Sequence, residues 1–590
     1  MLLQPRMSLT MMLPLSATVR TDNLSRMERE LFDVLVIGGG VTGAGVALDA
    51  AARGYRVALV EKGDFASSTS GKSTKLVHGG IRYLPNFDFA LVREALVERG
   101  ILLKNAPFLV HPIGFLLPIY KGDRHPVGIP FTTPGGLGLS LILNFGLWFY
   151  DMLAGRAGVG RHRHLSRSEM LKLAPMLVSE GLKEGFIYYD AQTHDARLTM
   201  ALIRTAVEHG AVVATYAEVT AFSSEDGTVK GVSVHDWSGG RDLTIRARHI
   251  VNATGIFSEK VEELTRLDLP VQIEPSKGVH LVLERAGIQP GKDAIVLPET
   301  DDKRILFIVP WESRVIFGTT DTGKGNLDSP SATAKDVAYL LKYLNRYLAV
   351  HLTEAEVIST YAGYRPLVSS RRSRRSTARL SRTHAVLQGS SGLVTIVGGK
   401  LTTYRRMAQD TVDVLSRRDG VRAPSHPTRH LPLSGSVGWS DTQNNLFARG
   451  TTLGLDHQVI EHLGRSYGTH SAEVLSLVEQ DATLGRRLID DLPYIRAEVV
   501  YGCRQEMAMT PLDVLARRTS ITIEDSHHGL NVLADVAALM APELGWSSEQ
   551  KEIMSEAFRS EIRQQYMAWI RPPQATKAIT RDSEQGENRL

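Results

Sequence analysis

A glycine-rich turn near the start of the chain constrains the fold more than any other feature. Gly38, Gly40 and Gly43 lie between the apolar run 34–37 and the alanine-rich stretch 44–53. In a βαβ unit the first glycine permits a tight turn, the second lets the backbone approach a pyrophosphate, and the third lets helix and strand pack closely. The sequence therefore predicts an α/β domain that binds a dinucleotide.

A second buried strand over 56–60 follows this helix, and Glu61 stands at its end. A carboxylate in this position accepts hydrogen bonds from ribose hydroxyls and repels a 2′-phosphate. A merely structural turn is the alternative, but strand, turn, helix, strand and acid fall in the expected order. The motif alone fits FAD and NAD, and its place at the chain start without a second copy favours FAD.

The chain has 590 residues, which is too long for one core and predicts several units. Further strand-like runs over 212–216, 244–253 and 393–397 are widely separated, so we expect one discontinuous domain with long insertions. From about Leu431 the pattern becomes helical, for example over 472–480, 510–518 and 547–566. This change predicts a separate helical domain at the C-terminal end.

The charge and cysteine content exclude several functional classes. The net charge is +4, which does not argue for nucleic acid but suits an anionic substrate or an anionic membrane surface. Cys503 is the single cysteine, so no internal disulfide can form; we expect a reducing compartment and a buried, inert thiol. No HExxH motif or clustered histidines and carboxylates indicate a metal site.

Two segments leave alternatives open. Residues 1–30 resemble no folded unit, and we expect either a loose tail or an artefact of the start codon, since Met7, Met11, Met12 or Met27 could begin a chain. The stretch 137–153 is apolar and ends in aromatic residues. It is marginally short for a membrane span, and it fits either an interfacial membrane helix or a buried core helix.

A series of motifs resembles the FAD-dependent glycerol-3-phosphate dehydrogenases of the bacterial aerobic and mitochondrial type. The matching segments, in order from about Phe32 to about Ala568, are 65–70 (FASSTS), 73–84 (STKLVHGGIRYL), 251–255 (VNATG), 275–280 (PSKGVH), 318–321 (GTTD), 361–367 (YAGYRPL), 398–405 (GGKLTTYR) and 504–519. Three features depart from the family pattern: Thr74 replaces a commoner serine, Ile256-Phe257 replaces a commoner Pro-Trp, and 369–377 is unusually rich in arginine.

The resemblance implies a Rossmann-like α/β FAD-binding domain of the D-amino-acid-oxidase group, with a β-rich substrate domain and a C-terminal α-helical domain. On this basis we expect a tail over 1–30 and a discontinuous FAD-binding domain over 31–425. The substrate domain would be inserted at about 111–180 and 270–370. A helical domain over 426–571 and a disordered tail over 572–590 complete the chain.

From the glycine turn and Glu61 we expect FAD bound without a covalent link, and the resemblance implies contacts from segments spread along the chain. The residues expected to contact it are Gly38, Gly40, Gly43, Glu61, Thr69, Ser70, Ser73, Lys75, His78, Gly79, Ala253, Gly255, Gly399, Lys400, Leu401 and Thr402.

The substrate implied by the resemblance is glycerol 3-phosphate, whose dianionic phosphate needs fixed cations. The residues expected around it are Arg82, Tyr83, His280, Arg365, Arg382 and Lys400. His280 is the natural base for the C2 hydroxyl proton while the hydride passes to flavin N5, with Arg365 and Lys400 as electrostatic partners. The alternative is that His280 only positions the substrate.

The expected activity is oxidation of sn-glycerol 3-phosphate to dihydroxyacetone phosphate, with electrons passed to membrane quinone. An oxidase that makes hydrogen peroxide from oxygen is one alternative, and a non-catalytic FAD-binding scaffold is another. Quinone reduction implies a cytoplasmic protein bound peripherally to the inner membrane. The arginines at 371–375 could be a solvated run or a lipid-facing patch, and a homodimer is possible.

Overall fold

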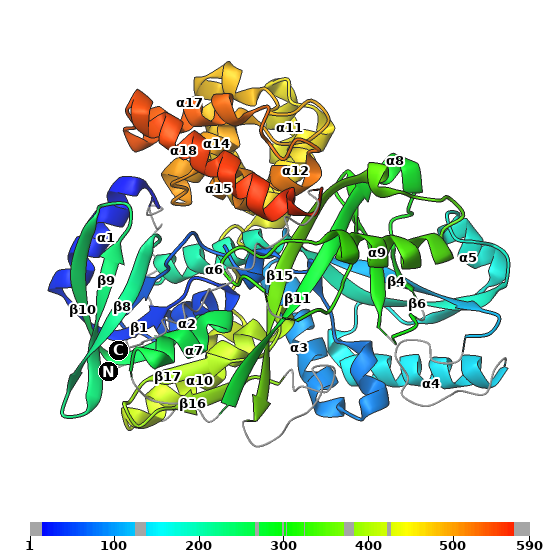
Figure 1. Ribbon diagram of the computed structural model, residues 1–590, viewed down its shortest axis with the longest axis horizontal. Coiled ribbons are helices and arrows are strands. Elements are labelled where there is room, and N and C mark those ends of the chain that lie inside the picture. The colour runs from blue at the N-terminus through cyan, green and yellow to red at the C-terminus, as the bar shows by residue number, and fades with distance from the viewer. Residues whose placement is uncertain are drawn as a thin grey trace, which may run out of the picture.

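The computed structural model describes residues 14–123, 137–265, 271–297, 300–302, 304–323, 325–370, 383–421 and 426–570. Figure 1 shows two β-sheets side by side, with the C-terminal helices lying across one end of both. Arg382, the run 371–375 and the tail 572–590 lie outside the described residues, so the expectations for them remain predictions.

The first sheet is the predicted nucleotide-binding sheet. Strands β17, β10, β1, β2 and β7 run parallel in that order, while β16 and the β8–β9 pair join antiparallel. Every residue of β2 and β17 is buried, as expected for strands covered on both faces. The strands predicted from the sequence are confirmed. Their bounds are β1 Leu31–Ile37, β2 Val57–Val60, β7 Val212–Ala214, β8 Ala217–Glu225, β9 Thr228–Asp236, β10 Arg241–Asn252, β16 Ala385–Gln388 and β17 Val394–Val397.

Three helices pack together against this sheet: α2 (Val41–Ala52), α6 (Asp195–Glu208) and α10 (Tyr404–Arg418). They lie far apart in the sequence, because α2 follows the first strand, α6 begins at Asp195 and α10 begins at Tyr404. The nucleotide-binding domain is therefore discontinuous in sequence, as its scattered strands predicted.

The N-terminal segment corrects an expectation, because residues 17–29 are not a loose tail. Helix α1 (Ala17–Arg29) buries Leu24 and Met27 against the first sheet. Arg20 forms a buried ion pair of 2.5 Å with Asp236, and Asn23 Nδ2 donates to the carbonyl of Val213 at 2.9 Å. This helix was not predictable from the sequence, because its buried face mixes polar and apolar side chains and therefore shows no apolar stripe.

The second sheet has the strand order β15-β11-β14-β13-β12-β4-β6-β3, with β5 paired to β6. It corresponds to the expected substrate domain but also takes in β3 and β6, which lie outside 111–180 and 270–370. The bounds are β3 Leu76–Val77, β4 Val110–Tyr120, β5 Arg163–Ser166, β6 Leu182–Thr193, β11 Val271–Glu284, β12 Ala294–Leu297, β13 Leu306–Trp311, β14 Arg314–Gly318 and β15 Val357–Ser370. Helices α3 (Phe89–Asn105), α5 (Arg167–Leu173), α7 (Ser258–Glu263), α8 (Arg285–Ile288) and α9 (Ala334–Tyr347) complete this part of the chain.

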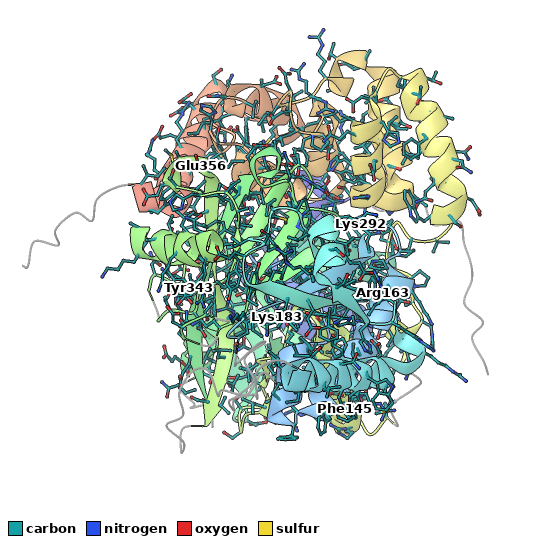
Figure 2. All side chains as sticks on the ribbon, turned by 90° about the vertical axis from the view of Figure 1, so that its right-hand side faces the viewer. Phe145, Arg163, Lys183, Lys292, Tyr343 and Glu356 are labelled. Atoms are coloured by element: carbon teal, nitrogen blue, oxygen red, sulfur yellow. The ribbon has the colours of Figure 1, made fainter. Side chains whose placement is uncertain are left out.

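Helix α4 (Leu137–Ala154) lies at the surface, at the end of the molecule opposite the C-terminal helices (Figures 1 and 2). One face packs on the protein through the buried residues Leu139, Leu143, Leu147 and Tyr150. The other face exposes Leu141, Phe145, Trp148 and Met152. The helix is therefore apolar on both faces, with one face packed and the other exposed, and the alternative of a buried core helix is wrong.

Residues Gly138–Ala157 are the one helical stretch in the described ranges long and apolar enough to cross a membrane. Their mean hydropathy is 1.2, and 28% of the stretch is buried. Since one face of α4 packs on the protein, the helix lies along the surface of the protein and does not stand out from it.

The C-terminal helical domain packs on both sheets rather than standing apart. One apolar core joins its residues Leu463 and Val474 to α2 and α6, and another joins Val514 and Ile521 to the second sheet. Its helices are α11 Trp439–Thr452, α12 His457–Tyr467, α13 Ser471–Gln480, α14 Arg496–Gln505, α15 Pro511–Asp513, α16 Ile521–Glu524, α17 Leu533–Leu544 and α18 Ser548–Glu561. The helical periodicity from about Leu431 onward predicted this domain.

Candidate active site

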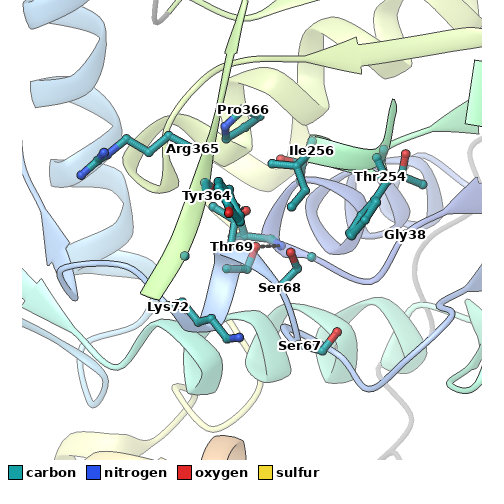
Figure 3. A pocket seen from close by; sticks show the side chains of 18 of the residues that line it. Gly38, Ser67, Ser68, Thr69, Lys72, Thr254, Ile256, Tyr364, Arg365 and Pro366 are labelled. Atoms are coloured by element: carbon teal, nitrogen blue, oxygen red, sulfur yellow. Dashed lines mark hydrogen bonds between the residues drawn. The ribbon is translucent and has the colours of Figure 1, made fainter. Parts of the chain in front are cut away.

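A cavity of about 550 Å³ opens where the two sheets meet. Its lining comes from the β1–α2 turn, the loop after β2, strands β11 and β15, and the turn between β17 and α10. In the view of Figure 3, Gly38, Thr254 and Ile256 lie on one side of the pocket, and Arg365 and Lys72 lie on the other. The cavity therefore joins a nucleotide-type turn to a cationic end.

The glycine turn is shaped as its sequence predicts. Gly38 has φ +109°, and a Cβ there would lie 2.8 Å from the carbonyl oxygen of Ala253. A Cβ on Gly43 would lie 1.9 Å from the carbonyl oxygen of Gly38, so only glycine lets α2 start this close to β1. Gly40 is the N-cap of α2 and lines the cavity. The helix N-terminus thus faces the cavity, where free N–H groups favour an anion.

Glu61 closes the same end of the cavity. Its carboxylate accepts hydrogen bonds from the backbone N–H groups of Gly39 at 2.6 Å and Gly63 at 2.9 Å. Burial raises the pKa of this carboxyl, while the two N–H donors oppose the rise. Each oxygen retains a lone pair for a further donor, as ribose recognition requires.

The loop after β2 contributes hydroxyl groups to the lining. Ser70 Oγ accepts from the N–H of Val41 at 2.9 Å, and Thr69 Oγ1 donates to the carbonyl of Tyr364 at 2.7 Å. Ser73 lines the cavity and donates to Asp195 through both its N–H and its hydroxyl. The loop is therefore tied both to the glycine turn and to strand β15.

Further lining residues belong to two other expected contact segments. Ala253 and Gly255 follow β10, and Gly399, Lys400, Leu401 and Thr402 follow β17. Gly399 has φ +82°, and a Cβ there would lie 2.3 Å from Met407 Sδ. His78 lines the cavity and donates its backbone N–H to Thr402 Oγ1 at 3.2 Å.

Two residues expected to touch the cofactor stand behind the lining. Lys75 is buried, and its ammonium forms an ion pair of 2.6 Å with Asp195. The backbone N–H of Gly79 donates to Asp190 at 3.0 Å, and a Cβ there would lie 2.4 Å from the hydroxyl of Tyr150. The structure therefore places Lys75 and Gly79 where they support the loop, because their polar groups are used within the protein.

His280 lies on β11 at the cavity wall and is 3% exposed. Its Nε2 is 2.9 Å from Thr74 Oγ1, and its ring stacks on Tyr361 with centroids 4.6 Å apart. Burial lowers the pKa of this imidazole well below its usual range, and the nearby charges of Arg365 and Lys75 lower it further. The ring is therefore neutral at pH 7 and can accept a proton.

Two cations of the expected set reach the lining. Arg365, on β15, donates from Nη2 to Thr319 Oγ1 at 3.0 Å and to the carbonyl of Thr320 at 3.1 Å. Its side chain is 24% exposed. The ammonium of Lys400 lies 4.1 Å from the centre of the Tyr83 ring. These cations make this part of the cavity suitable for an anionic ligand.

The other expected substrate residues are only partly placed. Arg82 belongs to the 3-10 helix Ile81–Asn86, which comes directly after the Gly79-Gly80 pair, but its side chain is not among those described. Tyr83, in the same helix, is largely buried beneath Lys400. Arg382 lies outside the described residues.

The structure also brings to the site residues that sequence reasoning missed. Thr74 and Lys72 line the cavity, and Tyr361 supports His280 from the neighbouring strand. The ammonium of Lys72 donates to Gln565 Oε1 in the C-terminal domain at 2.6 Å, and burial lowers its pKa to about 8. Thr74 and Tyr361 lie inside family motifs, which was a usable signal; no signal linked Lys72 to Gln565.

Comparisons with known proteins identify the family and the fold. The family described as FAD dependent oxidoreductase (DAO) matches residues 33–405, and the C-terminal domain of alpha-glycerophosphate oxidase matches residues 426–551. Glycerol-3-phosphate dehydrogenase 2 of Mycobacterium tuberculosis is 38% identical over 563 residues, 95% of this chain and 92% of that protein. The mitochondrial glycerol-3-phosphate dehydrogenase of Mesocricetus auratus is 37% identical over 88% of this chain and 72% of its own.

Among solved structures, the glycerol-3-phosphate dehydrogenase of Bacillus halodurans complexed with FAD superimposes with a TM-score of 0.76. It is 31% identical in sequence, and the match covers 93% of this chain and 98% of that chain. The expected fold class is thereby confirmed.

Proposed function

This chain belongs to the FAD-dependent glycerol-3-phosphate dehydrogenase family, and we propose that it oxidises sn-glycerol 3-phosphate to dihydroxyacetone phosphate and passes the electrons to a membrane quinone. One observation carries the proposal: the glycine turn, two cations and a neutral histidine line a single cavity. A nucleotide site alone would need neither the histidine nor a guanidinium on the side of the pocket opposite the glycine turn (Figure 3).

FAD is the cofactor of the family, and the residues at the cavity fit it. The Gly38 turn leaves room that a Cβ would fill, the α2 N-terminus favours a pyrophosphate, and the Glu61 carboxylate suits ribose hydroxyls. When bound, FAD supplies a hydride acceptor at its N5 atom. We infer that Ser70, Ala253, Gly255 and Thr402 complete its binding surface, as the lining supports.

For the substrate, we assign the phosphate and the reacting alcohol to Arg365 and Lys400. A guanidinium offers paired N–H donors to phosphate oxygens, and an ammonium is a compact charge that favours a developing alkoxide. Arg82 joins this set through its position in the 73–84 motif, and Arg382 joins it as a further residue that the family resemblance implies. Tyr83 contributes by holding the ammonium of Lys400 over its ring.

We further propose that His280 removes the proton from the C2 hydroxyl of the substrate. Burial and the neighbouring cations keep the imidazole neutral, so that a nitrogen lone pair is available. As the proton leaves, negative charge develops on the substrate oxygen, and Arg365 and Lys400 stabilise it. Loss of the proton and loss of the hydride from C2 together give the ketone.

The exposed face of α4 supports a proposal for the acceptor and the location. Phe145 and Trp148 are 66% and 52% exposed, and Phe87, in the loop before α3, is 76% exposed. Aromatic side chains grouped in this way suit the membrane interface, where quinone is reached from the cytoplasmic side. We therefore propose peripheral attachment to the cytoplasmic membrane, with oxygen as the competing acceptor.

Anaerobic titration of the purified protein tests the activity. Protein purified with its flavin should bleach when glycerol 3-phosphate is added and should not bleach with unphosphorylated glycerol. Equal bleaching with glycerol would remove the phosphate assignment, and no bleaching with either would remove the dehydrogenase. Reoxidation by a quinone analogue, set against peroxide formation in air, then distinguishes the acceptors.

A further inference from the structure

The ring of His280 is held by its neighbours across the second sheet. In the strand register, His280 on β11 pairs with Tyr361 on β15 and with Gly318 on β14. The Tyr361 ring stacks on the imidazole at an interplanar angle of 12°. On the opposite side, a Cβ at Gly318 would lie 2.6 Å from the imidazole Cδ2. One face and one edge of the ring are therefore fixed by packing.

Hydrogen bonding to the ring comes from Thr74. Its Oγ1 lies 2.9 Å from His280 Nε2, whereas Nδ1 is buried and has no hydrogen-bond partner among the residues that the structure describes. Thr74 also lines the cavity, so its hydroxyl stands beside both the ring and the ligand space. Packing restrains the plane of the ring, and this bond selects between the two orientations related by a flip about the Cβ–Cγ bond.

The position of Thr74 is itself strongly determined. Its two chain neighbours are both anchored to Asp195: Ser73 through its N–H and hydroxyl at 2.9 and 2.7 Å, and Lys75 through its ammonium at 2.6 Å. Lys75 has the left-handed φ of +59°, and the hydroxyl of Tyr361 donates to the carbonyl of Ser73 at 2.9 Å. This arrangement aims one hydroxyl at the imidazole and fixes both ends of the turn that carries it.

We propose that Thr74 is a positioning residue for the base: its hydroxyl, at the edge of the ligand space, holds the His280 imidazole so that Nε2 takes the proton of the substrate, and it then accepts from the resulting Nε2–H. The inference rests on the proposed function and deepens it. The commoner residue here, serine, supplies the same hydroxyl, whereas the extra methyl group of threonine restricts its rotation.

The charges around His280 make this role measurable. Arg365 faces the ring from β15, and Lys75 faces it from the turn before β3 with its partner Asp195; both cations oppose protonation of the imidazole. The hydroxyl of Tyr361 is engaged by Ser73. The Thr74 oxygen favours protonation, because it can accept from the N–H of an imidazolium. Removing it should therefore lower the pKa of His280 and weaken the base.

The test compares Thr74→Val with Thr74→Ser in the flavin-containing enzyme, by stopped-flow flavin reduction with saturating glycerol 3-phosphate across the pH range. We expect Thr74→Val to reduce the high-pH rate about 10- to 100-fold, within the roughly 10²–10⁴ that a general base contributes. The acid limb of the profile should move to lower pH, and Thr74→Ser should restore both the rate and the limb. Thr360→Val, which removes a buried hydroxyl from β15 without a hydrogen-bond partner in the described ranges, is the matched control and should match the parent.

Several outcomes would overturn the inference. A reduced rate with an unmoved acid limb would place Thr74 outside the function of the base, and so would an unchanged rate. Thr74→Ala is the second variant: if it and Thr74→Val both lose flavin, the role of Thr74 is in cofactor binding. Failure of the proposed function looks different, since the parent enzyme itself would then not be reduced by glycerol 3-phosphate.

Discussion

At the residue scale, burial shifts the pKa values of two cavity residues, His280 and Glu61, in opposite directions. It lowers the pKa of His280, which keeps that base neutral, and it raises the pKa of Glu61, which the N–H groups of Gly39 and Gly63 counteract. Desolvation disfavours the charged form in both cases, and nearby hydrogen-bond donors and charges determine the size of each pKa shift. Burial in one cavity thus gives a neutral base, His280, and a carboxyl group held by hydrogen bonds, Glu61.

Replacing Arg365 with alanine should raise the KM for glycerol 3-phosphate tenfold or more while FAD remains bound. A charge-assisted hydrogen bond contributes about 1.5–3 kcal/mol, which corresponds to roughly 10- to 100-fold in binding. Steady-state kinetics with a dye acceptor, together with the flavin absorbance of the purified variant, would measure both effects. Arg163→Ala, which removes an exposed arginine paired with Glu169, is the control. An unchanged KM would show that Arg365 does not contact the phosphate.

Local spacing was enough to predict part of the site. Gly38, Gly40, Gly43 and Glu61 lie within one βαβ unit, so their geometry follows from their order in the chain. The support of Lys75 by Asp195 was not predictable in this way, because the partners are far apart in sequence and meet only when β3 pairs with β6. Family motifs pointed to His280, Arg365 and Lys400, and the cavity brings these three together.

At the element scale, the β1–α2 turn tolerates no side chain at its third glycine. Gly43→Ala would place a methyl group 1.9 Å from the carbonyl oxygen of Gly38, which is backbone and cannot move without displacing β1 or α2. We expect this variant to lose FAD and to melt at a lower temperature. Gly146→Ala in α4, where a Cβ meets no atom within 4 Å, is the control. It should gain up to about 1 kcal/mol from helix propensity. Full flavin content in Gly43→Ala would contradict this account.

Helix α16 ends in a buried carboxylate that makes stability depend on pH. Burial and the charge of Glu312 raise the pKa of Glu524 to about 7, although Tyr494 donates to it at 2.7 Å. The folded protein therefore binds this proton more tightly than the unfolded chain, and stability falls as pH rises from about 4.5 to 7. Glu524→Gln should remove this loss, so the variant should gain about 2–3 kcal/mol over the parent between pH 5 and pH 8.

Urea unfolding of both proteins at a series of pH values would measure that gain. The difference in the free energy of unfolding between variant and parent is followed as a function of pH, because the glutamine amide itself adds an effect on stability that does not change with pH. Glu552→Gln, at an exposed position on α18, should show no such slope. Parallel stability curves for Glu524→Gln and the parent would mean that Glu524 stays ionised in the folded protein.

The elements themselves were predictable where one pattern determined them. The all-apolar runs that became β1, β2 and β17 are buried on both faces, and the helical periodicity of the C-terminal segment predicted a helical domain. Helix α1 was not predicted, because Arg20 and Asn23 occupy its buried face. Their polar groups are satisfied by Asp236 and the carbonyl of Val213, which are remote in sequence. Burial of a polar residue becomes favourable only through such partners.

At the scale of the whole molecule, the C-terminal domain and the cavity are mechanically joined. Arg518 forms a bidentate ion pair with Asp64, in the loop after β2, at 2.6 and 2.8 Å, and both side chains are buried. Lys72 in the same loop donates to Gln565. A buried charge that lost its partner would be strongly unfavourable, so this domain holds the loop that lines the cavity.

The exposed face of α4 should hold the protein on the membrane, at the end of the molecule opposite this domain (Figure 2). Because apolar burial is not screened by ions, high salt should release the protein from membranes only partly, while mild detergent should release it fully. A double substitution of Phe145 and Trp148 by glutamate should move it to the soluble fraction, since charges must then enter the interface. Leu139, Leu143 and Leu147 still anchor the helix to the protein in that variant, so activity with a dye acceptor should survive.

Trp237→Glu is the matched control for this prediction, because Trp237 is 61% exposed but lies beside β9 in the first sheet. It should leave membrane binding unchanged, which would show that binding depends on the aromatic residues of α4 and not on exposed aromatic residues in general. If the Phe145 and Trp148 variant stays on the membrane with its flavin intact, α4 is not the docking face. If the parent is wholly soluble at low salt and makes peroxide at its full turnover rate, oxygen replaces quinone as the acceptor.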